Sequence, residues 1–172
     1  MAVGMWHRLD QTGRNLLPFA ITVAMMLVSM APMRLPGFST VAPPLTLIAV
    51  FYWAIHRPDL LRPSIAFLIG LLQDLLSGAP LGMTPLVLTL CYWVLITQRR
   101  FFLGSSFLLL WWGFAMVAGA ASLVQWAAYS LMEATVLDVK PAVFQALVAI
   151  AIFPAPAWIL MRIHRAFLNE EG

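Results

Sequence analysis

The sequence predicts an all-α integral membrane protein, a single bundle of six transmembrane helices whose termini both lie in the cytoplasm. The first observation is composition: 62% of the 172 residues are hydrophobic, 10% are charged, and the mean hydropathy is +0.90. A soluble domain carries roughly 25% charged residues, so this chain has too little polar surface to cover a water-soluble globule. The second observation is the placement of its ten Lys and Arg residues.

These basic residues gather in alternate gaps between the apolar segments. If each segment crosses the membrane once and the N-terminus lies inside, only Arg34 and Lys140 face outward. The cytoplasmic side then carries Arg8, Arg14, Arg57, Arg62, Arg99, Arg100, Arg162 and Arg165. Such an asymmetry is typical of a polytopic inner-membrane protein. It also explains the net charge of +3, so no nucleic-acid partner is predicted.

Six apolar segments give the predicted passes, within one membrane domain covering residues 1–172. A helix needs about 20 residues to span a hydrocarbon core about 30 Å thick. The predicted passes run approximately over residues 16–33, 43–56, 63–77, 81–97, 104–131 and 141–163.

The first three passes end at recognisable turns. The first closes at Leu35-Pro36-Gly37, and the second begins at Pro43-Pro44, which suits a first helical turn, and ends at residues 56–59. The third begins at Pro63 and stops at Gly78-Ala79-Pro80. The second and third offer only about 15 residues, roughly 23 Å, so we expect them to thin the bilayer or to lie away from lipid.

The last three passes are bounded by basic residues. The fourth starts at about Leu81 and stops at Gln98-Arg99-Arg100. The fifth lies within Leu103–Met132, longer than one crossing requires, and is expected to tilt or to protrude. The sixth runs from Pro141 to a basic end near Ile163. A four-pass alternative, in which the third and fourth passes form a re-entrant hairpin, preserves the charge pattern and stays open.

Asp74 is the acidic residue that falls inside an apolar segment. A carboxylate at the bilayer centre costs at least roughly 2.5–3.5 kcal/mol on insertion scales, so it must face protein or water. Gly70, Asp74 and Gly78 are spaced four apart and Ser77 lies three beyond Asp74, so they share one helix face. Gln73 adds a second polar group. We expect this face to point into the bundle, where small residues permit close helix approach.

Three roles for Asp74 compete. It can be a structural hydrogen-bonding group that pins the turn containing Gly78, Pro80 and Gly82, a site of ion or proton coupling, or the polar lining of a ligand cavity. No intramembrane Lys or Arg accompanies it, and one acid is little for a transport relay. The structural role is therefore favoured.

A second set of small residues lies in the fifth pass. Ala115, Gly119 and Ser122 form a face suited to helix packing within the chain or to contact with a partner helix. The cytoplasmic turns carrying Arg57, Arg62, Arg99 and Arg100 either set the topology alone or also attract anionic lipid or an acidic partner surface.

No catalytic or metal-binding arrangement is predicted. The histidines His7, His56 and His164 have no acid or cysteine cluster beside them, and Cys91 is a single cysteine. No nucleophile arrangement, nucleotide-binding loop or carboxylate pair is present. The sequence therefore predicts neither an enzyme nor a cofactor.

The segment from Gly70 to Gly82 reads Gly-Leu-Leu-Gln-Asp-Leu-Leu-Ser-Gly-Ala-Pro-Leu-Gly. It resembles the central signature of the MreD family of rod shape-determining membrane proteins. Pro43-Pro44-Leu45 and the aromatic sequence Phe51-Tyr52-Trp53 also fit that family. Outside residues 43–100 the likeness is one of hydropathy.

The resemblance implies a non-enzymatic scaffold of the cell-wall elongation machinery in the bacterial inner membrane. Its implied partners are the bitopic protein MreC, the actin-like MreB, membrane lipid, and a RodA-type polymerase with its class B penicillin-binding protein. The family is also similar to the six-helix substrate-binding subunits of energy-coupling-factor vitamin transporters. That similarity implies the alternative function, a small-molecule-binding subunit of a transporter.

Overall fold

The computed structural model describes residues 3–31 and 44–167, with the side chains of residues 16–31 and 44–166. The described chain contains helices and no strand, which confirms the predicted all-helical class. The helices are α1 Val3–Met30, α2 Leu45–His56, α3 Pro63–Ser77, α4 Met83–Phe102, α5 Phe107–Met132, α6 Lys140–Ile152 and α7 Pro154–Phe167.

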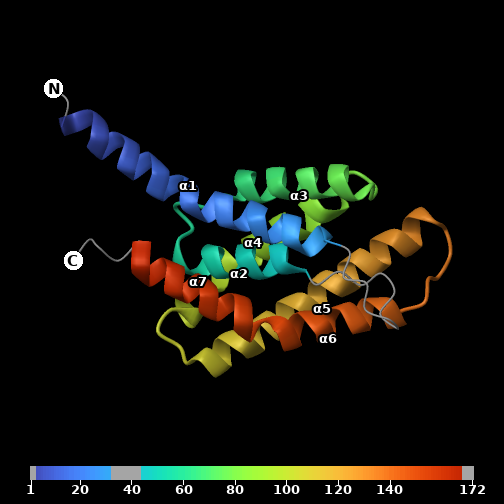
Figure 1. The fold of residues 1–172 in the computed structure, drawn as a ribbon. Helices are drawn as coiled ribbons and strands as arrows, with labels where there is room; N and C mark the ends of the chain where they lie inside the picture. Colours follow the sequence, from blue (N-terminus) through green and yellow to red (C-terminus); the bar gives the residue numbers. More distant parts are fainter. Residues whose placement is uncertain (1–2, 32–43, 168–172) are drawn as a thin grey trace.

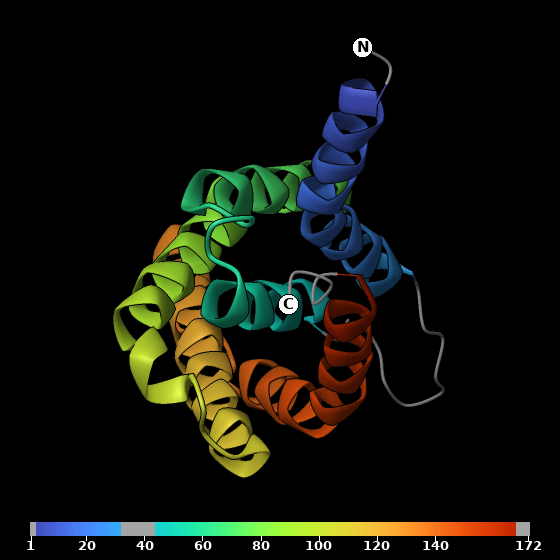
Figure 2. The same ribbon diagram turned by 90° about the vertical axis from the view of Figure 1, so that its left-hand side faces the viewer.

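α2 is the central helix of the bundle, and the other helices surround it (Figure 2). Every residue from Thr46 to Ile55 is buried. A helix that is apolar on all sides is stable only when neighbours cover all of those sides, and α1, α4, α5 and α7 all contact α2. α2 has 12 residues, or roughly 18 Å of helix. α2 is shorter than a full membrane crossing, but the neighbouring helices separate it from the surroundings of the bundle.

Four phenylalanines pack where α2 meets the carboxyl end of α4, α5 and the junction of α6 with α7. We call Phe51, Phe102, Phe114 and Phe153 the aromatic cluster. Phe114 and Phe153 stack with their ring centroids 4.3 Å apart, and Phe51 meets both of them edge to face at 5.3 and 5.7 Å. Phe102 meets Phe51 at 6.1 Å. These geometries are favourable for aromatic rings and fix the helices relative to one another.

The predicted sixth pass, 141–163, is occupied by two helices that meet at Phe153 with a bend of 45°. Pro154 explains the break, because a proline inside a helix has no N–H for the carbonyl four residues earlier and its ring clashes with that group. The carbonyl concerned belongs to Ile150. It accepts a hydrogen bond of 2.9 Å from the indole Nε1–H of Trp111 on α5. Trp111 of α5 therefore supplies the hydrogen-bond donor that the Ile150 carbonyl lacks within its own helix.

The boundaries of α4 also differ from the predicted fourth pass, 81–97. α4 continues to Phe102, so Arg99 and Arg100 lie in its last turn. Basic residues mark where a segment leaves the apolar region, but they are good helix formers and favour a helix carboxyl end. The third predicted pass, 63–77, has the same bounds as α3.

α5 is the one described helix that is long and apolar enough to cross a membrane alone. The bent pair α6 and α7 qualifies as a second candidate, and α2, α3 and residues 16–30 of α1 are shorter apolar helices. Large apolar side chains, including Trp93, Trp112 and Met116, cover much of the outside of α4 and α5.

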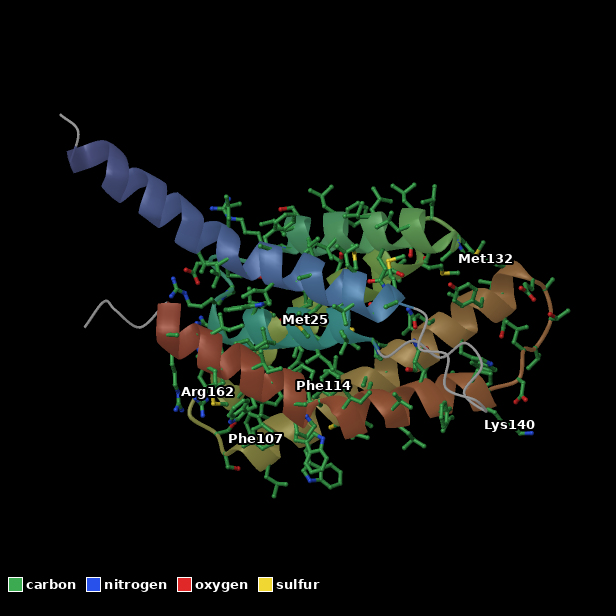
Figure 3. All side chains as sticks on the ribbon, viewed as in Figure 1. Met25, Phe107, Phe114, Met132, Lys140 and Arg162 are labelled. Carbon is green, nitrogen blue, oxygen red and sulfur yellow. The ribbon has the colours of Figure 1, made fainter. Side chains whose placement is uncertain are left out.

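The described helices run between two ends of the molecule. The start of α1 and the end of α7 lie at one end, which also holds the connections at 57–62 and 103–106 (Figure 1). We call this the basic end. The connections at 78–82 and 133–139 lie at the other, the turn end. Figure 3 shows Arg162 toward the basic end and Met132 and Lys140 at the turn end.

Candidate functional site

Asp74 is a fully buried carboxylate near the end of α3, and it holds the start of α4. Its Oδ2 accepts hydrogen bonds from the backbone N–H groups of Gly82, at 2.9 Å, and Thr84, at 3.2 Å. The first N–H groups of a helix lack partners within it, and the positive end of the helix dipole favours an anion. The amino-terminal cap of α4, Gly82, has no side chain to serve them. Asp74 therefore caps α4 from the preceding helix.

Gly70 allows α3 and α4 to approach backbone to backbone. A Cβ atom added to Gly70 would lie 2.7 Å from both the N and the Cα of Pro85 and 3.0 Å from the carbonyl carbon of Thr84. Backbone atoms in a helix cannot move aside as a side chain can. Any larger residue at position 70 would therefore push the two helices apart.

Two glycines make the turn between α3 and α4 possible. Gly78 caps the carboxyl end of α3 with φ of +69°, and Gly82 precedes α4 with φ of +102°. Both values lie in the left-handed region that residues with a Cβ rarely adopt. The amide of Met83 reaches back to the carbonyl of Pro80 at 3.4 Å. The signature from Gly70 to Gly82 thus folds as one helix-turn-helix unit with Asp74 at its centre.

Gln73 and Ser77 do not join the Asp74 cap but line a cavity of about 560 Å³ at the turn end, which we call the polar cavity. Ser122 of α5 lines the same cavity, so the structure brings the predicted polar face of α3 and part of the predicted small-residue face of α5 together. Its polar lining residues are Ser29, Thr46, Gln73, Ser77, Thr84, Ser122, Gln125 and Gln145. A neighbouring cavity of about 410 Å³ shares Ser122, Gln125 and Gln145 with it.

The three residues of the predicted small-residue face of α5 have different surroundings in the structure. Ser122 is buried, and Ala115 is half-buried. Gly119 is half-buried as well, but a Cβ atom added there would meet nothing within 4 Å. Gly119 therefore has open space beside it, whereas Gly70 has none.

The predicted basic turns are partly engaged within the chain. Arg57 pairs with Asp59 at 3.3 Å, while Arg62 and Arg100 are exposed. The Nε–H of Arg99 donates a hydrogen bond of 2.7 Å to the carbonyl of Ile55. That carbonyl is one of the last four of α2, which have no partner within the helix, and a cation is favourable there. Arg99 therefore ties the end of α4 to the end of α2.

His164 lies on α7 at the same end, beside the carboxyl end of α2. Its ring stacks near Trp53, with centroids 6.1 Å apart, and lies 6.0 Å from the ring of His56. Burial lowers the pKa of His164, and the nearby charges of His56 and Arg57 lower it further. The neutral imidazole is thus favoured at this position.

The comparison with known families decides the chain's relationship. The model of the family described as rod shape-determining protein MreD matches residues 10–164 of the 172. The chain belongs to the MreD family. Among curated proteins and among solved structures, nothing matches.

Membership of the MreD family confirms the resemblance drawn from the segment between Gly70 and Gly82. It gives the protein a role in the determination of rod shape, within a membrane-associated family. The similarity to the substrate-binding subunits of energy-coupling-factor transporters stays a prediction.

The sequence does not indicate two contacts that organise this MreD-family structure, nor one residue that lines its polar cavity. For Arg99 the sequence indicates a role in topology or in attracting anionic lipid or an acidic partner, whereas in the structure it also closes the end of α2. Trp111 was not singled out, although Pro154 already implied a free carbonyl at Ile150 and hence a donor nearby. Thr46 was not singled out because it is one hydroxyl in an apolar segment, and no local pattern indicates that it borders a cavity.

Proposed function

We propose that the protein is a multi-pass scaffold of the bacterial inner membrane that takes part in rod shape determination by holding other proteins of cell-wall elongation together. Its proposed partners are an MreC-like bitopic protein, an actin-like MreB, and a RodA-type polymerase with its class B penicillin-binding protein. In this proposal the chain has no turnover of its own, and lateral peptidoglycan synthesis belongs to the partners.

The observation that carries the membrane part of the proposal is that apolar residues cover the outside of the bundle as well as fill its inside. Thr46–Ile55 of α2 are buried inside the bundle, yet large apolar side chains such as Trp93, Trp112 and Met116 are 66–75% exposed on the outside. A soluble monomer rarely exposes contiguous apolar surface on this scale. Lipid is the environment in which both the inside and the outside can be apolar.

The six-pass topology with both termini inside is supported by where the charges lie. The connection at 57–62 and the carboxyl end of α4, which carry Arg57, Arg62, Arg99 and Arg100, lie at the basic end (Figure 1), and Lys140 lies at the turn end (Figure 3). Reporter fusions test this arrangement. Fusions after Gly78 and after Asp138 should read periplasmic, and a fusion after Gly172 should read cytoplasmic. A cytoplasmic signal after Gly78 would favour the four-pass alternative with a re-entrant hairpin.

The scaffold part of the proposal is supported by a small-residue position without an intramolecular neighbour. Gly119 has open space beside it, so a leucine there should fit within the monomer and obstruct a partner helix. We expect Gly119→Leu to insert and fold normally but to lose co-purification of the MreC-like protein from mild detergent. Ala151→Leu, at an exposed position of α6, is the matched control and should retain the partner. Retention of the partner by both variants would remove Gly119 from the interface.

A second candidate function, a substrate-binding subunit of a vitamin-type transporter, is favoured by one observation, the polar cavity of about 560 Å³. The two candidates differ in their companions. A scaffold should co-purify with MreC-like and MreB-like chains, whereas a transporter subunit should co-purify with energising subunits and depend on them for uptake of its substrate.

A further inference from the structure

We propose that the polar cavity is a binding site for one neutral, hydroxyl-rich group, a sugar or polyol that is either free or carried as the head group of a lipid. The inference goes beyond the scaffold proposal and does not depend on it, because a chain that holds partners can carry a ligand as well.

The size and the lining of the polar cavity are those of a small-molecule site. Its volume of about 560 Å³ lies within the range of roughly 300–1,000 Å³ that is usual for ligand pockets. Three amide side chains reach it from three helices: Gln73 from α3, Gln125 from α5 and Gln145 from α6. Convergence of polar groups from separate helices is uncommon inside an apolar bundle unless they have a shared partner.

Two of the lining residues carry buried polar atoms that have no hydrogen-bond partner. They are Oγ1 of Thr46 and Oε1 of Gln73. Thr46 is only 2% exposed and stands in the first turn of the central helix. Buried polar atoms in proteins nearly always have a partner. Both residues line the polar cavity, so a rotation of either side chain would turn its unpartnered oxygen toward an occupant, which would supply the missing hydrogen bond.

The absence of charge among the described lining residues selects a neutral ligand. No described residue that lines the polar cavity is acidic or basic. An ion there would lose its hydration without gaining a counter-charge. The nearest acid in the sequence, Asp74, is not among the described lining residues: its Oδ2 accepts hydrogen bonds from Gly82 and Thr84, and its buried Oδ1 has no partner. Asp138 borders only the neighbouring cavity and hydrogen-bonds the backbone of Lys140.

The chemistry of the lining selects hydroxyl groups. Amides and hydroxyls both donate and accept hydrogen bonds, and a ligand hydroxyl does the same, so a polyol can satisfy them in either orientation. The apolar residues of the lining, Leu47, Leu76, Val87 and Leu88 among them, suit the C–H face of a sugar or the start of an acyl chain. The lining therefore fits a free sugar and a lipid-borne sugar equally, and the experiment must separate them.

The test is thermal unfolding of the full chain in a polyoxyethylene detergent, which has no sugar head group to compete. The probes are glucose and N-acetylglucosamine as free sugars, monoglucosyl diacylglycerol as the lipid-borne sugar, and glucose 6-phosphate and diacylglycerol as controls. We expect saturable stabilisation by a neutral sugar probe and none by the controls. Stabilisation by a free sugar identifies a soluble ligand, and stabilisation by the glycolipid alone identifies a lipid head group.

Matched variants tie the effect to the cavity. Gln73→Leu and Thr46→Val should weaken apparent binding at least tenfold. Gln98→Leu and Thr97→Val make the same changes at exposed positions of α4 and should bind as the unmodified chain does. Thr46→Val conserves the side-chain shape, so it decides the matter if Gln73→Leu does not fold. Sugars also stabilise proteins by exclusion from their surface, but that effect neither saturates nor depends on Thr46.

Three outcomes would overturn the proposal. They are the absence of saturable stabilisation by every neutral probe, equal stabilisation by glucose 6-phosphate or diacylglycerol, and unchanged binding in both cavity variants. Each would leave the polar cavity as a water-filled space. Co-purification of the MreC-like protein is measured separately, so failure here is distinguishable from failure of the scaffold proposal.

Discussion

The aromatic cluster and the polar cavity lie along the same central helix, yet they are built in opposite ways. Around Phe51 the rings of α2, α4, α5 and the α6–α7 junction interlock, and Phe51, Phe114 and Phe153 have no exposed surface. Around Thr46, near the other end of α2, amides and hydroxyls surround a space of about 560 Å³. One region is filled by side chains, and the other is left open.

The difference shows how a small membrane bundle can combine a rigidly packed region with an internal cavity. Lipid is as apolar as a leucine side chain, so helices in a bilayer associate mainly through close packing and hydrogen bonds. The aromatic cluster relies on packing. At the turn end, the Asp74 cap and the contact of Gly70 with Pro85 hold α3 against α4 without filling the space beside them.

Removing a ring from the filled region should have the largest effect. Phe114→Ala leaves a cavity beside Phe51 and Phe153 and should lower the free energy of unfolding by about 3–5 kcal/mol. Thr46→Val, beside the open region, should change it by less than about 1 kcal/mol because valine keeps the side-chain shape and Oγ1 of Thr46 has no hydrogen bond to lose. Denaturant unfolding in mixed micelles measures both. Equal losses would mean that the polar cavity is packed as tightly as the aromatic cluster.

The close backbone contact at the turn end should tolerate almost no added volume. Gly70→Ala places a methyl group 2.7 Å from the backbone of Pro85 and should cost about 2–3 kcal/mol as α3 and α4 separate. Gly119→Ala is the matched control, since the added methyl meets nothing within 4 Å, and it should be neutral or slightly stabilising. Similar losses in both variants would show that glycine is needed at 70 for some reason other than contact with α4.

The Asp74 cap should contribute less than the backbone contact. Asp74→Leu leaves the amides of Gly82 and Thr84 buried without acceptors and should cost about 2 kcal/mol. Asp74→Asn keeps one acceptor oxygen and should cost about 1 kcal/mol or less. Thermal unfolding checks the order of the two, and amide exchange at Gly82 and Thr84 should accelerate in Asp74→Leu only. If Asn proves as damaging as Leu, the charge of Asp74 matters beyond the cap.

Local chemistry explains which features could be predicted from the sequence. Pro63 at the first turn and Gly78 at the end fix α3, because proline and glycine act through their own backbone geometry. The inward direction of Asp74 follows from the cost of a carboxylate in hydrocarbon, and its place four residues before Gly78 indicated the turn. These inferences need only the residue and its immediate neighbours in the sequence.

Features that join distant segments could not be predicted in the same way. The hydrogen bond of Arg99 to Ile55 spans 44 positions, and that of Trp111 to Ile150 spans 39. A basic residue after an apolar segment is equally compatible with topology alone, and a tryptophan in an apolar helix with lipid contact. The polar cavity depends on α1 to α6 together, so no single periodic pattern contains it. Only Pro154 carried a local signal for its contact, because its missing N–H specifies which carbonyl is freed.

The smallest effect is expected at the basic end, where the imidazole of His164 faces His56 on α2, the neighbouring charge of Arg57 and the ring of Trp53. Burial lowers the pKa of His164 below its ordinary value of 6.5, with His56 and Arg57 adding to the effect. The folded chain therefore binds this proton more weakly than the unfolded chain does. The stability that results is fully present above pH 6.5 and is lost as the pH falls through that value toward the lower pKa of the folded state.

The thermal midpoint of the detergent-solubilised chain should thus decrease between pH 7.5 and pH 5.5, and His164→Gln should show a smaller decrease because a glutamine does not titrate. His164 is partly open to solvent, which keeps the difference modest. If both proteins lost the same amount, the pH dependence would belong to His56 or to other groups, and the neutral form of His164 would not contribute to holding α7 against α2.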